Sequence, residues 1–318
     1  MPGKEVLGLK QFSGKYTGVF LIAVLVFGLA AGIVGCGGRS GPSSGKITLR
    51  DDNGKTLVME KPADRVVSLA PSNTEIIYAI DGQKKLVGVT TYCDYPPAAK
   101  KMVKIGDFST PNVEKIASRN PQVVFATGGV QAGAVTNLEK LGIKVFVVDP
   151  KSFNGLFADM EKVGEIMGLK DQAMAKVDAL KKRVATVESK SKNLTKPKAF
   201  FEIYAQPLMT AGKGTLIDSM ISMAGGTNLG AAAGPDFPQY SQETLLQDNP
   251  DVYVAVKGTQ TNPGDIAKRP GYETIKAVKD GKVYVVEDNL FVRSGPRLVD
   301  GLEQLAVMFH PEVFKSQQ

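Results

Sequence analysis

The chain has 318 residues, of which 43% are hydrophobic and 22% charged, and its formal net charge is +7. This composition is typical of a globular protein with one large domain or two of moderate size. Basic residues are scattered, as in the solvated run 181–183, and form no stripe interleaved with aromatic side chains. We therefore expect no nucleic-acid partner.

The scarcity of histidine and cysteine limits the chemistry that is available. His310 is the only histidine, too little for a Ser-His-Asp hydrolase or for a metal site built from several histidines. We expect no enzymatic activity, no catalytic residue, no cofactor and no metal. His310 precedes Pro311 and is predicted to be a surface residue at a helix end. Cys93 is predicted to be a buried small hydrophobic residue.

Residues 1–35 have the pattern of an export signal. Lysines precede an uncharged apolar run at 19–31, and Ile33-Val34-Gly35-Cys36 follows. A basic front, a short apolar run and small residues are typical of a secretory signal, although an uncleaved membrane anchor is an alternative. Residues 36–46 have the Gly/Ser composition of a flexible tether. Without residues 1–35 the net charge is +5.

The residues Ile33-Val34-Gly35-Cys36 resemble the lipobox of bacterial lipoproteins. The resemblance implies that Cys36 is lipidated and becomes the first residue of the mature protein. The protein is then expected to be exported and held by lipid at the outer face of the cytoplasmic membrane, the periplasmic side in a diderm.

Residues 47–152 are predicted to form a first α/β lobe. Asn53-Gly54 between two apolar runs predicts a hairpin. Ser72 and Glu75 have the spacing of a capping box at a helix start. Strands are expected at 65–70, 86–90, 122–126 and 144–148. Helices are expected to begin at Ser72 and to span 113–119 and 130–141. This alternation with short loops favours a parallel sheet.

Residues 153–192 follow helical periodicity with one interruption near Gly168, and we expect one long, rigid connecting helix. Residues 193–318 are predicted to form a second α/β lobe. Its expected strands are 199–203, 252–256 and 283–286, and its expected helices are 216–224, 241–247 and 296–309.

The two predicted lobes share an internal sequence repeat. Segment 114–126 matches segment 243–255, and both contain a glutamate, an Asn-Pro pair that ends a helix, and a buried strand. The strict register favours two homologous lobes with a ligand cleft between them. Glu114 and Glu243 take equivalent places in the first turn of a short helix. They either complement the helix dipole or form a matched pair for a dimeric partner with arginine-rich pockets.

Several segments, in this order, resemble the substrate-binding proteins of iron-siderophore, haem and vitamin B12 importers, above all the cobalamin-binding ones. These segments are 65–75, 88–97, 106–108, 112–116, 128–129, 237–243 and 293–297. The resemblance implies the class III periplasmic-binding-protein fold, with two Rossmann-like lobes, one rigid helix and a cleft. It further implies a monomer that delivers its ligand to an ABC permease dimer with its ATPase subunits. Glu114 and Glu243 match the positions that dock on permease arginines.

The resemblance also implies the ligand-binding side chains. Tyr92 matches a cleft aromatic residue of the cobalamin-binding proteins. Phe108 and Phe237 stand at positions where a protein of that group has tryptophans. The further expected ligand-binding residues are Asn73, Gly128, Gly129, Tyr204, Gln206, Phe291 and Arg293. The chain contains no tryptophan, which weakens the assignment to a corrinoid. A corrinoid such as cobalamin is the leading expectation, and a ferric siderophore or haem is the alternative.

Overall fold

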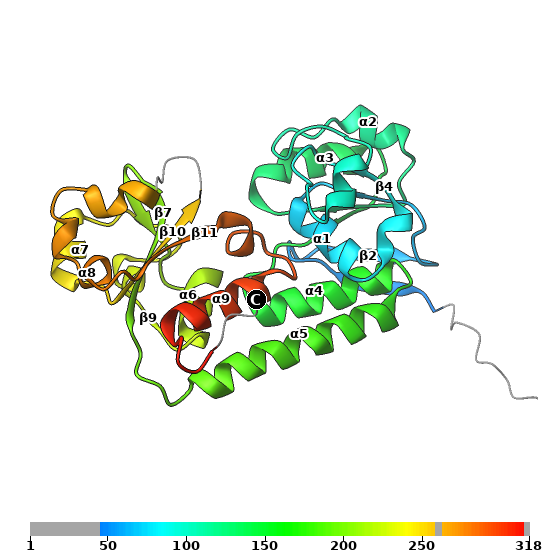
Figure 1. Cartoon of the computed structure of the whole chain (residues 1–318). Helices are drawn as coiled ribbons and strands as arrows, with labels where there is room; N and C mark the ends of the chain where they lie inside the picture. Colours follow the sequence, from blue (N-terminus) through cyan, green and yellow to red (C-terminus); the bar gives the residue numbers. More distant parts are fainter. Residues whose placement is uncertain (1–44, 258–262, 315–318) are drawn as a thin grey trace, which may run out of the picture. The chain divides into compact units, whose positions relative to one another are not determined.

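The computed structural model describes residues 45–257 and 263–314 (Figure 1). The expected signal 1–35, Cys36 and most of the tether 36–46 lie outside these residues. Within the two described ranges, no helix has both the length and the apolar composition needed to cross a membrane.

The first lobe is built on a four-stranded parallel sheet in the order β4-β3-β5-β6 (Figure 1). Its strands are β3 (Val66–Ser68), β4 (Leu86–Val89), β5 (Val123–Ala126) and β6 (Val145–Val147). Alternate strand residues point to opposite faces. One face packs with helix α1 (Pro71–Ala79), and the other with α2 (Val113–Ser118) and α3 (Ala132–Lys140). The predicted hairpin is β1 (Ile47–Arg50) with β2 (Thr56–Met59).

The second lobe repeats this plan. Strands β7 (Lys198–Ala205), β10 (Val252–Lys257) and β11 (Val283–Glu287) are parallel, with β10 in the middle. β8 (Leu208–Thr210) pairs antiparallel to β7, and the short β9 (Thr227–Asn228) pairs parallel to it. Helices α6 (Leu216–Met223) and α9 (Leu298–Phe309) cover one face, and α7 (Gln242–Asp248) and α8 (Lys276–Lys279) the other.

The connection between the lobes differs from the single helix expected at 153–192. It consists of α4 (Phe153–Ile166) and α5 (Lys170–Ser191), which lie side by side (Figure 1). Gly168 has φ +65°, a left-handed conformation that ends α4 and turns the chain back. The apolar periodicity continues across the turn because both helices bury residues in the same core. Helix α4 packs on α1, whereas α5 reaches α9 of the second lobe.

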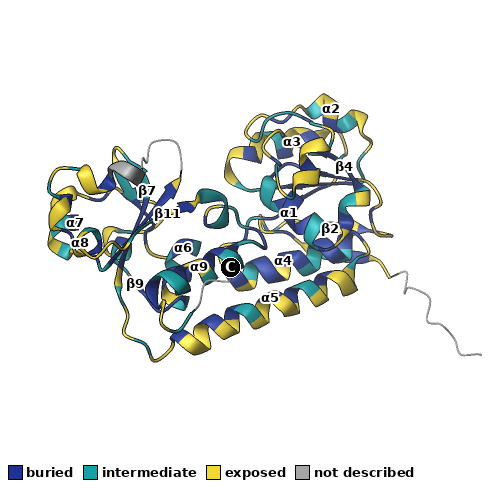
Figure 2. Cartoon of the chain, in the orientation of Figure 1, coloured by how far each residue is buried: buried dark blue, intermediate teal, exposed yellow. Residues whose placement is uncertain are grey.

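Exposure follows these layers (Figure 2): the central strands β3, β5, β6 and β10 and the inner sides of α4 and α9 are mostly buried, and much of α5 and α7 is exposed. Short 3-10 turns join the larger elements at Gly82–Lys85, Pro97–Lys101, Gly129–Gln131, Leu229–Ala233, Pro263–Lys268, Tyr272–Thr274 and Asp288–Leu290.

Two local predictions were wrong. Helix α1 begins at Pro71 with Ala70 as its N-cap, so Ser72 is not a cap, and Glu75 is buried instead of completing a capping box. His310 is also buried, at 3% exposure, and its Nε2 lies within hydrogen-bonding distance, 3.2 Å, of the carbonyl oxygen of Gly225. The prediction that Cys93 is buried is confirmed.

Candidate functional site

A cavity of about 510 Å³ lies at the carboxyl ends of the strands of the first lobe. Each strand contributes the residues that follow it: Pro71 after β3, Tyr92 after β4, Thr127 after β5 and Asp149 after β6. Segment 292–294, which follows β11 of the second lobe, closes the cavity from the other side. Open α/β sheets bind their ligands in this position, beyond the carboxyl ends of the strands.

A second cavity, of about 430 Å³, adjoins the first because Val292 and Ser294 line both. Phe237 and the start of α6 form its wall in the second lobe, and Lys151 its wall in the first. We call the two cavities together the cleft. A larger hollow of about 720 Å³ lies between α5 and α9. It is not at the strand ends, so we favour the cleft as the functional site.

The cleft exposes large apolar side chains from both lobes. Tyr92 is 58% exposed, Phe237 44% and Val292 48%, and Phe108 is half-buried in the wall of the first cavity. Exposed apolar side chains that gather in one place often indicate a site of interaction or a ligand-binding groove. The geometry therefore provides apolar contact area on both sides of a bound molecule.

A buried ion cluster joins the lobes beside the cleft. Glu75 on α1 accepts hydrogen bonds from Arg297 at 2.8 and 2.6 Å and from Arg293 at 3.3 Å. Arg293 also donates to Asp94 at 2.6 Å. Burial acts to raise the pKa of Asp94, but the hydrogen bond and charge of Arg293 outweigh it and hold this pKa below its usual value. The guanidinium of Arg297 stacks 3.9 Å from the ring of Tyr95.

The hydrogen bonds that Arg297 donates to Glu75 raise the pKa of Arg297, so this arginine remains charged. Glu75 and Asp94 belong to the first lobe, and the two arginines belong to the segment between β11 and α9 in the second. The cluster thus fixes one lobe against the other at the edge of the first cavity.

The structure brings five of the ten predicted ligand-binding residues to the cleft walls: Tyr92, Phe108, Phe237, Phe291 and Arg293. Phe291 borders the second cavity but is only 1% exposed, and its ring packs 5.3 Å from that of Phe201. It belongs to the core as well as to the cleft.

The other five residues do not line either cavity. Asn73 is 1% exposed, and its amide donates to the carbonyl oxygen of Ala126 at 3.0 Å, which joins α1 to β5. The remaining four are Gly128, Gly129, Tyr204 and Gln206. Gly129 has φ +63° and makes a turn.

The sequence did not predict most of the other residues of the cleft walls, among them Asp107, Asp149, Lys151 and Val292. A signal for two of them was present, because Asp149 and Lys151 follow a predicted strand of a parallel sheet. Asp107 and Val292 lie in loops whose course depends on tertiary contacts.

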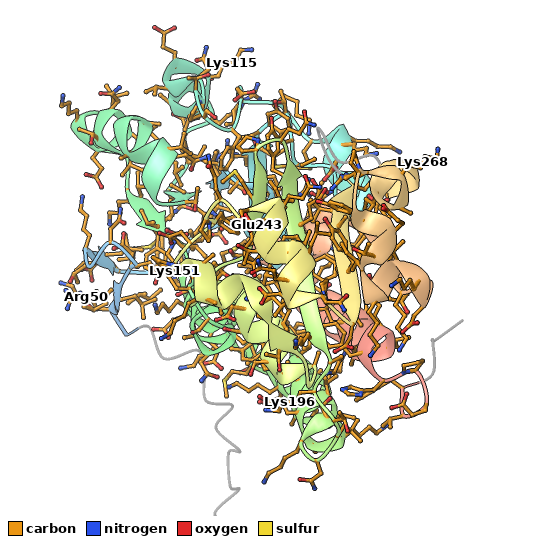
Figure 3. The ribbon with its side chains drawn as sticks, turned by 90° about the vertical axis from the view of Figure 1, so that its left-hand side faces the viewer. Arg50, Lys115, Lys151, Lys196, Glu243 and Lys268 are labelled. Atoms are coloured by element: carbon orange, nitrogen blue, oxygen red, sulfur yellow. The ribbon has the colours of Figure 1, made fainter. Side chains whose placement is uncertain are left out.

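Glu114 and Glu243 occupy matching local positions. Both are exposed in the first turn of a short helix, behind the N-caps Asn112 and Ser241, whose side chains accept from the amides of Lys115 and Thr244. Figure 3 labels Glu243 on α7 and Lys115, the neighbour of Glu114, on α2. Within the described part of the chain, neither glutamate has an ion-pair partner.

Comparisons with known proteins agree with this geometry. Residues 66–290 match the family model described as periplasmic binding protein. The chain is 33% identical over 324 residues to the "Uncharacterized ABC transporter substrate-binding lipoprotein YvrC" of Bacillus subtilis, covering 96% of this chain and 100% of that one. It is 30% identical over 249 residues to the vitamin B12-binding protein of Photorhabdus laumondii, covering 76% and 86%.

Solved structures that have the same fold are named for different ligands. The periplasmic vitamin B12 binding protein BtuF of Vibrio cholerae aligns with a TM-score of 0.69 at 25% identity, over 80% of this chain and 99% of that one. A periplasmic heme binding protein from Pseudomonas aeruginosa aligns with a TM-score of 0.68 at 26% identity, over 79% and 94%. The expected class III fold is confirmed. The chain belongs to the periplasmic binding protein family, the solute-binding proteins of ABC importers, which are not enzymes.

Proposed function

We propose that this protein captures a corrinoid such as cobalamin outside the cytoplasmic membrane and delivers it to an ABC permease with its ATPase subunits. The observation that carries the proposal is the combination of apolar side chains exposed from both lobes with cations that are already paired. Tyr92, Phe108 and Phe237 offer faces to a large flat ring. Drug-sized ligands fill cavities of roughly 300–1,000 Å³, so a larger corrinoid needs both parts of the cleft.

The charges of the cleft favour a corrinoid over the anionic alternatives. Among the described residues that line the two cavities, the cations are Arg293 and Lys151. Arg293 is paired with Glu75 and Asp94, and Lys151 with Asp149 at 2.8 Å. Haem propionates and catecholate or carboxylate ferric siderophores carry negative charge, which unpaired cations in the cleft wall would favour. The amide-bearing rim of a corrinoid can instead donate hydrogen bonds to carboxylates in the cleft wall.

Titration of the detergent-solubilised full chain with cyanocobalamin by calorimetry tests the ligand, with haemin and a ferric siderophore titrated in parallel. We expect one-to-one binding of cyanocobalamin with a Kd in the micromolar range or tighter. Tyr92→Ala and Phe237→Ala are each expected to weaken binding about 10-fold, the loss of one buried aromatic contact. Leu141→Ala is the matched control, because Leu141 is as exposed as Tyr92 but lies outside the cleft. If the protein binds haemin but does not bind cyanocobalamin, the corrinoid assignment is overturned.

We further propose that Cys36 carries the lipid anchor, that the protein acts as a monomer, and that Glu114 and Glu243 dock on the permease. The name of the Bacillus subtilis relative includes the word lipoprotein, and the sequence around Cys36 supports the same role here. Reversing both glutamates to lysine should abolish uptake and leave ligand affinity intact, because neither lies in the cleft. Glu188→Lys on α5 is the matched control. Uptake unchanged by the double reversal would contradict the docking role.

A further inference from the structure

Gln131 is a fully buried polar side chain below the first cavity. It ends the 3-10 turn Gly129–Gln131 and has 0% exposure. Its amide nitrogen Nε2 donates to the carbonyl oxygens of Leu69 at 2.7 Å and Phe108 at 2.8 Å. Its oxygen Oε1 accepts from the backbone N–H of Thr127 at 2.9 Å. Both donors and the acceptor of the side chain are therefore used.

The three partners lie on three separate loops of the cleft. Leu69 immediately precedes the cavity residues 70–72 at the end of β3, whereas Phe108 and Thr127 line the cavity themselves. Leu69 and Phe108 are 62 and 23 residues from Gln131 in the sequence. One side chain thus joins three wall segments, of which the end of β3 is also held to β5 by the backbone bond from Leu69 to Phe125 at 2.9 Å.

The glycines before Gln131 allow this arrangement. Gly129 has φ +63°, which turns the chain back under the end of β5. A Cβ atom on Gly128 would lie 2.5 Å from Oδ2 of Asp149, so a larger residue here would have to displace that side chain. The two glycines, expected from the sequence to approach the ligand, instead bring Gln131 into reach of the three loops.

We infer that Gln131 is the positioning residue of the cleft, which fixes Phe108 and Thr127 against the end of β3 without touching the ligand. The part of this inference that concerns affinity rests on the proposed function, and the part that concerns the loops does not. A buried polar group that loses its partner costs more than the hydrogen bond itself contributes. Removing the amide therefore leaves three backbone groups unpaired and releases the loops.

The experiment compares two variants with a matched control in the detergent-solubilised full chain. Gln131→Leu removes all three hydrogen bonds at similar volume. Gln131→Glu keeps the acceptor for Thr127 but places a carboxylate oxygen against the two carbonyl oxygens. Val135→Ala, one turn further along in α3, is expected to destabilise the same lobe, and it leaves the three hydrogen bonds of Gln131 in place.

The first measurement is amide hydrogen exchange, by mass spectrometry, without ligand. In Gln131→Leu we expect exchange at Thr127 to rise at least 10-fold and segment 106–110 to lose protection. The amide of Val124, which donates to Lys144, should not change. Gln131→Glu should retain protection at Thr127 and lose it around Phe108. If Gln131→Leu and Gln131→Glu both show the same amide exchange rates as Val135→Ala, the inference is overturned.

The second measurement is the Kd for cyanocobalamin in all four proteins. We expect at least 10-fold weaker binding in Gln131→Leu and an unchanged Kd in Val135→Ala at an equal loss of Tm. Equal affinities in Gln131→Leu and Val135→Ala would leave Gln131 an ordinary core residue and overturn the inference. If the unaltered chain does not bind cyanocobalamin, the corrinoid proposal fails, and the hydrogen-exchange result alone decides the role of Gln131.

Discussion

Replacing Arg297 with methionine removes the main partner of the buried carboxylate between the lobes. The side chain of Glu75 is 2% exposed and receives two of its three hydrogen bonds from Arg297. The variant leaves Glu75 with Arg293 alone, at 3.3 Å. Breaking a buried ion pair by removing one partner costs about 3–5 kcal/mol. Because Arg293 remains and the side chain of Arg297 is 18% exposed, we expect a loss of roughly 2–4 kcal/mol.

At about 2–4 °C per kcal/mol for a protein of this size, Tm should fall by roughly 4–16 °C. The assay is urea unfolding at equilibrium together with scanning calorimetry. Arg183→Met is the matched control, because Arg183 also donates three hydrogen bonds to carboxylates, those of Asp300 and Glu303. Its side chain is 38% exposed, so solvent screening should keep its loss below about 1 kcal/mol.

A double-mutant cycle with Glu75→Gln separates the pair from its surroundings. We expect a coupling energy of at least about 1.5 kcal/mol between Glu75 and Arg297. A loss in Arg297→Met no greater than that in Arg183→Met would refute the reasoning, because burial would then make no difference to the strength of these ion pairs.

Three further predictions concern single side chains. Burial raises the pKa of Asp159 from 3.8 to about 7, with Asp52 adding to the rise and Lys162 opposing it. The folded state therefore holds more protons than the unfolded state between about pH 4 and 7, and the free energy of unfolding should fall as pH rises through this window, by up to about 1.4 kcal/mol per pH unit. Urea unfolding of Asp159→Asn should show this slope removed; an unchanged slope would exclude Asp159 as its source. Lys104 donates to the carbonyl oxygens of Thr90, Cys93 and Ala99 around the Tyr92 loop. Lys104→Met should lower Tm by a few degrees and weaken cyanocobalamin binding several-fold in calorimetry, whereas full affinity would show that the loop holds without this lysine. Gly128→Ala should weaken the same binding, since the new methyl group displaces Asp149, and a crystal structure with Asp149 unmoved would contradict this account.

The sequence was most informative where neighbouring residues determine the structure. The Asn-Pro repeat predicted the end of a short helix and the buried strand after it in each lobe, and β5 and β10 follow α2 and α7 as expected. The strands could be located because buried parallel strands appear as short apolar runs between turn residues. The carboxyl ends of these strands then placed much of the cleft wall.

The sequence misled where a distant partner decides the outcome. Glu75 has the spacing of a capping box, but its partner Arg297 is 222 residues away and lies in the other lobe. The local pattern could not show that the carboxylate is buried. Gly168 gave a sign of a break, yet the apolar periodicity on both sides favoured one helix, because α4 and α5 share one core. Gln131 carries no signal in its own neighbourhood, since two of its three partners are on other loops.

Arg293 connects the ligand site with the arrangement of the lobes. It lines the first cavity, and its Nη1 donates to both Glu75 and Asp94. A ligand that drew this guanidinium into the cleft would leave two carboxylates with fewer partners, one of them 2% exposed. Because charge-assisted hydrogen bonds to buried groups are each worth about 1.5–3 kcal/mol, such a movement opposes binding. We therefore expect Arg293 to act mainly as a support between the cleft walls, and the apolar side chains of Tyr92, Phe108 and Phe237 to provide the contact with the proposed ligand. The cleft is built before the ligand arrives, within the first lobe by Gln131 and between the lobes by the Glu75 cluster.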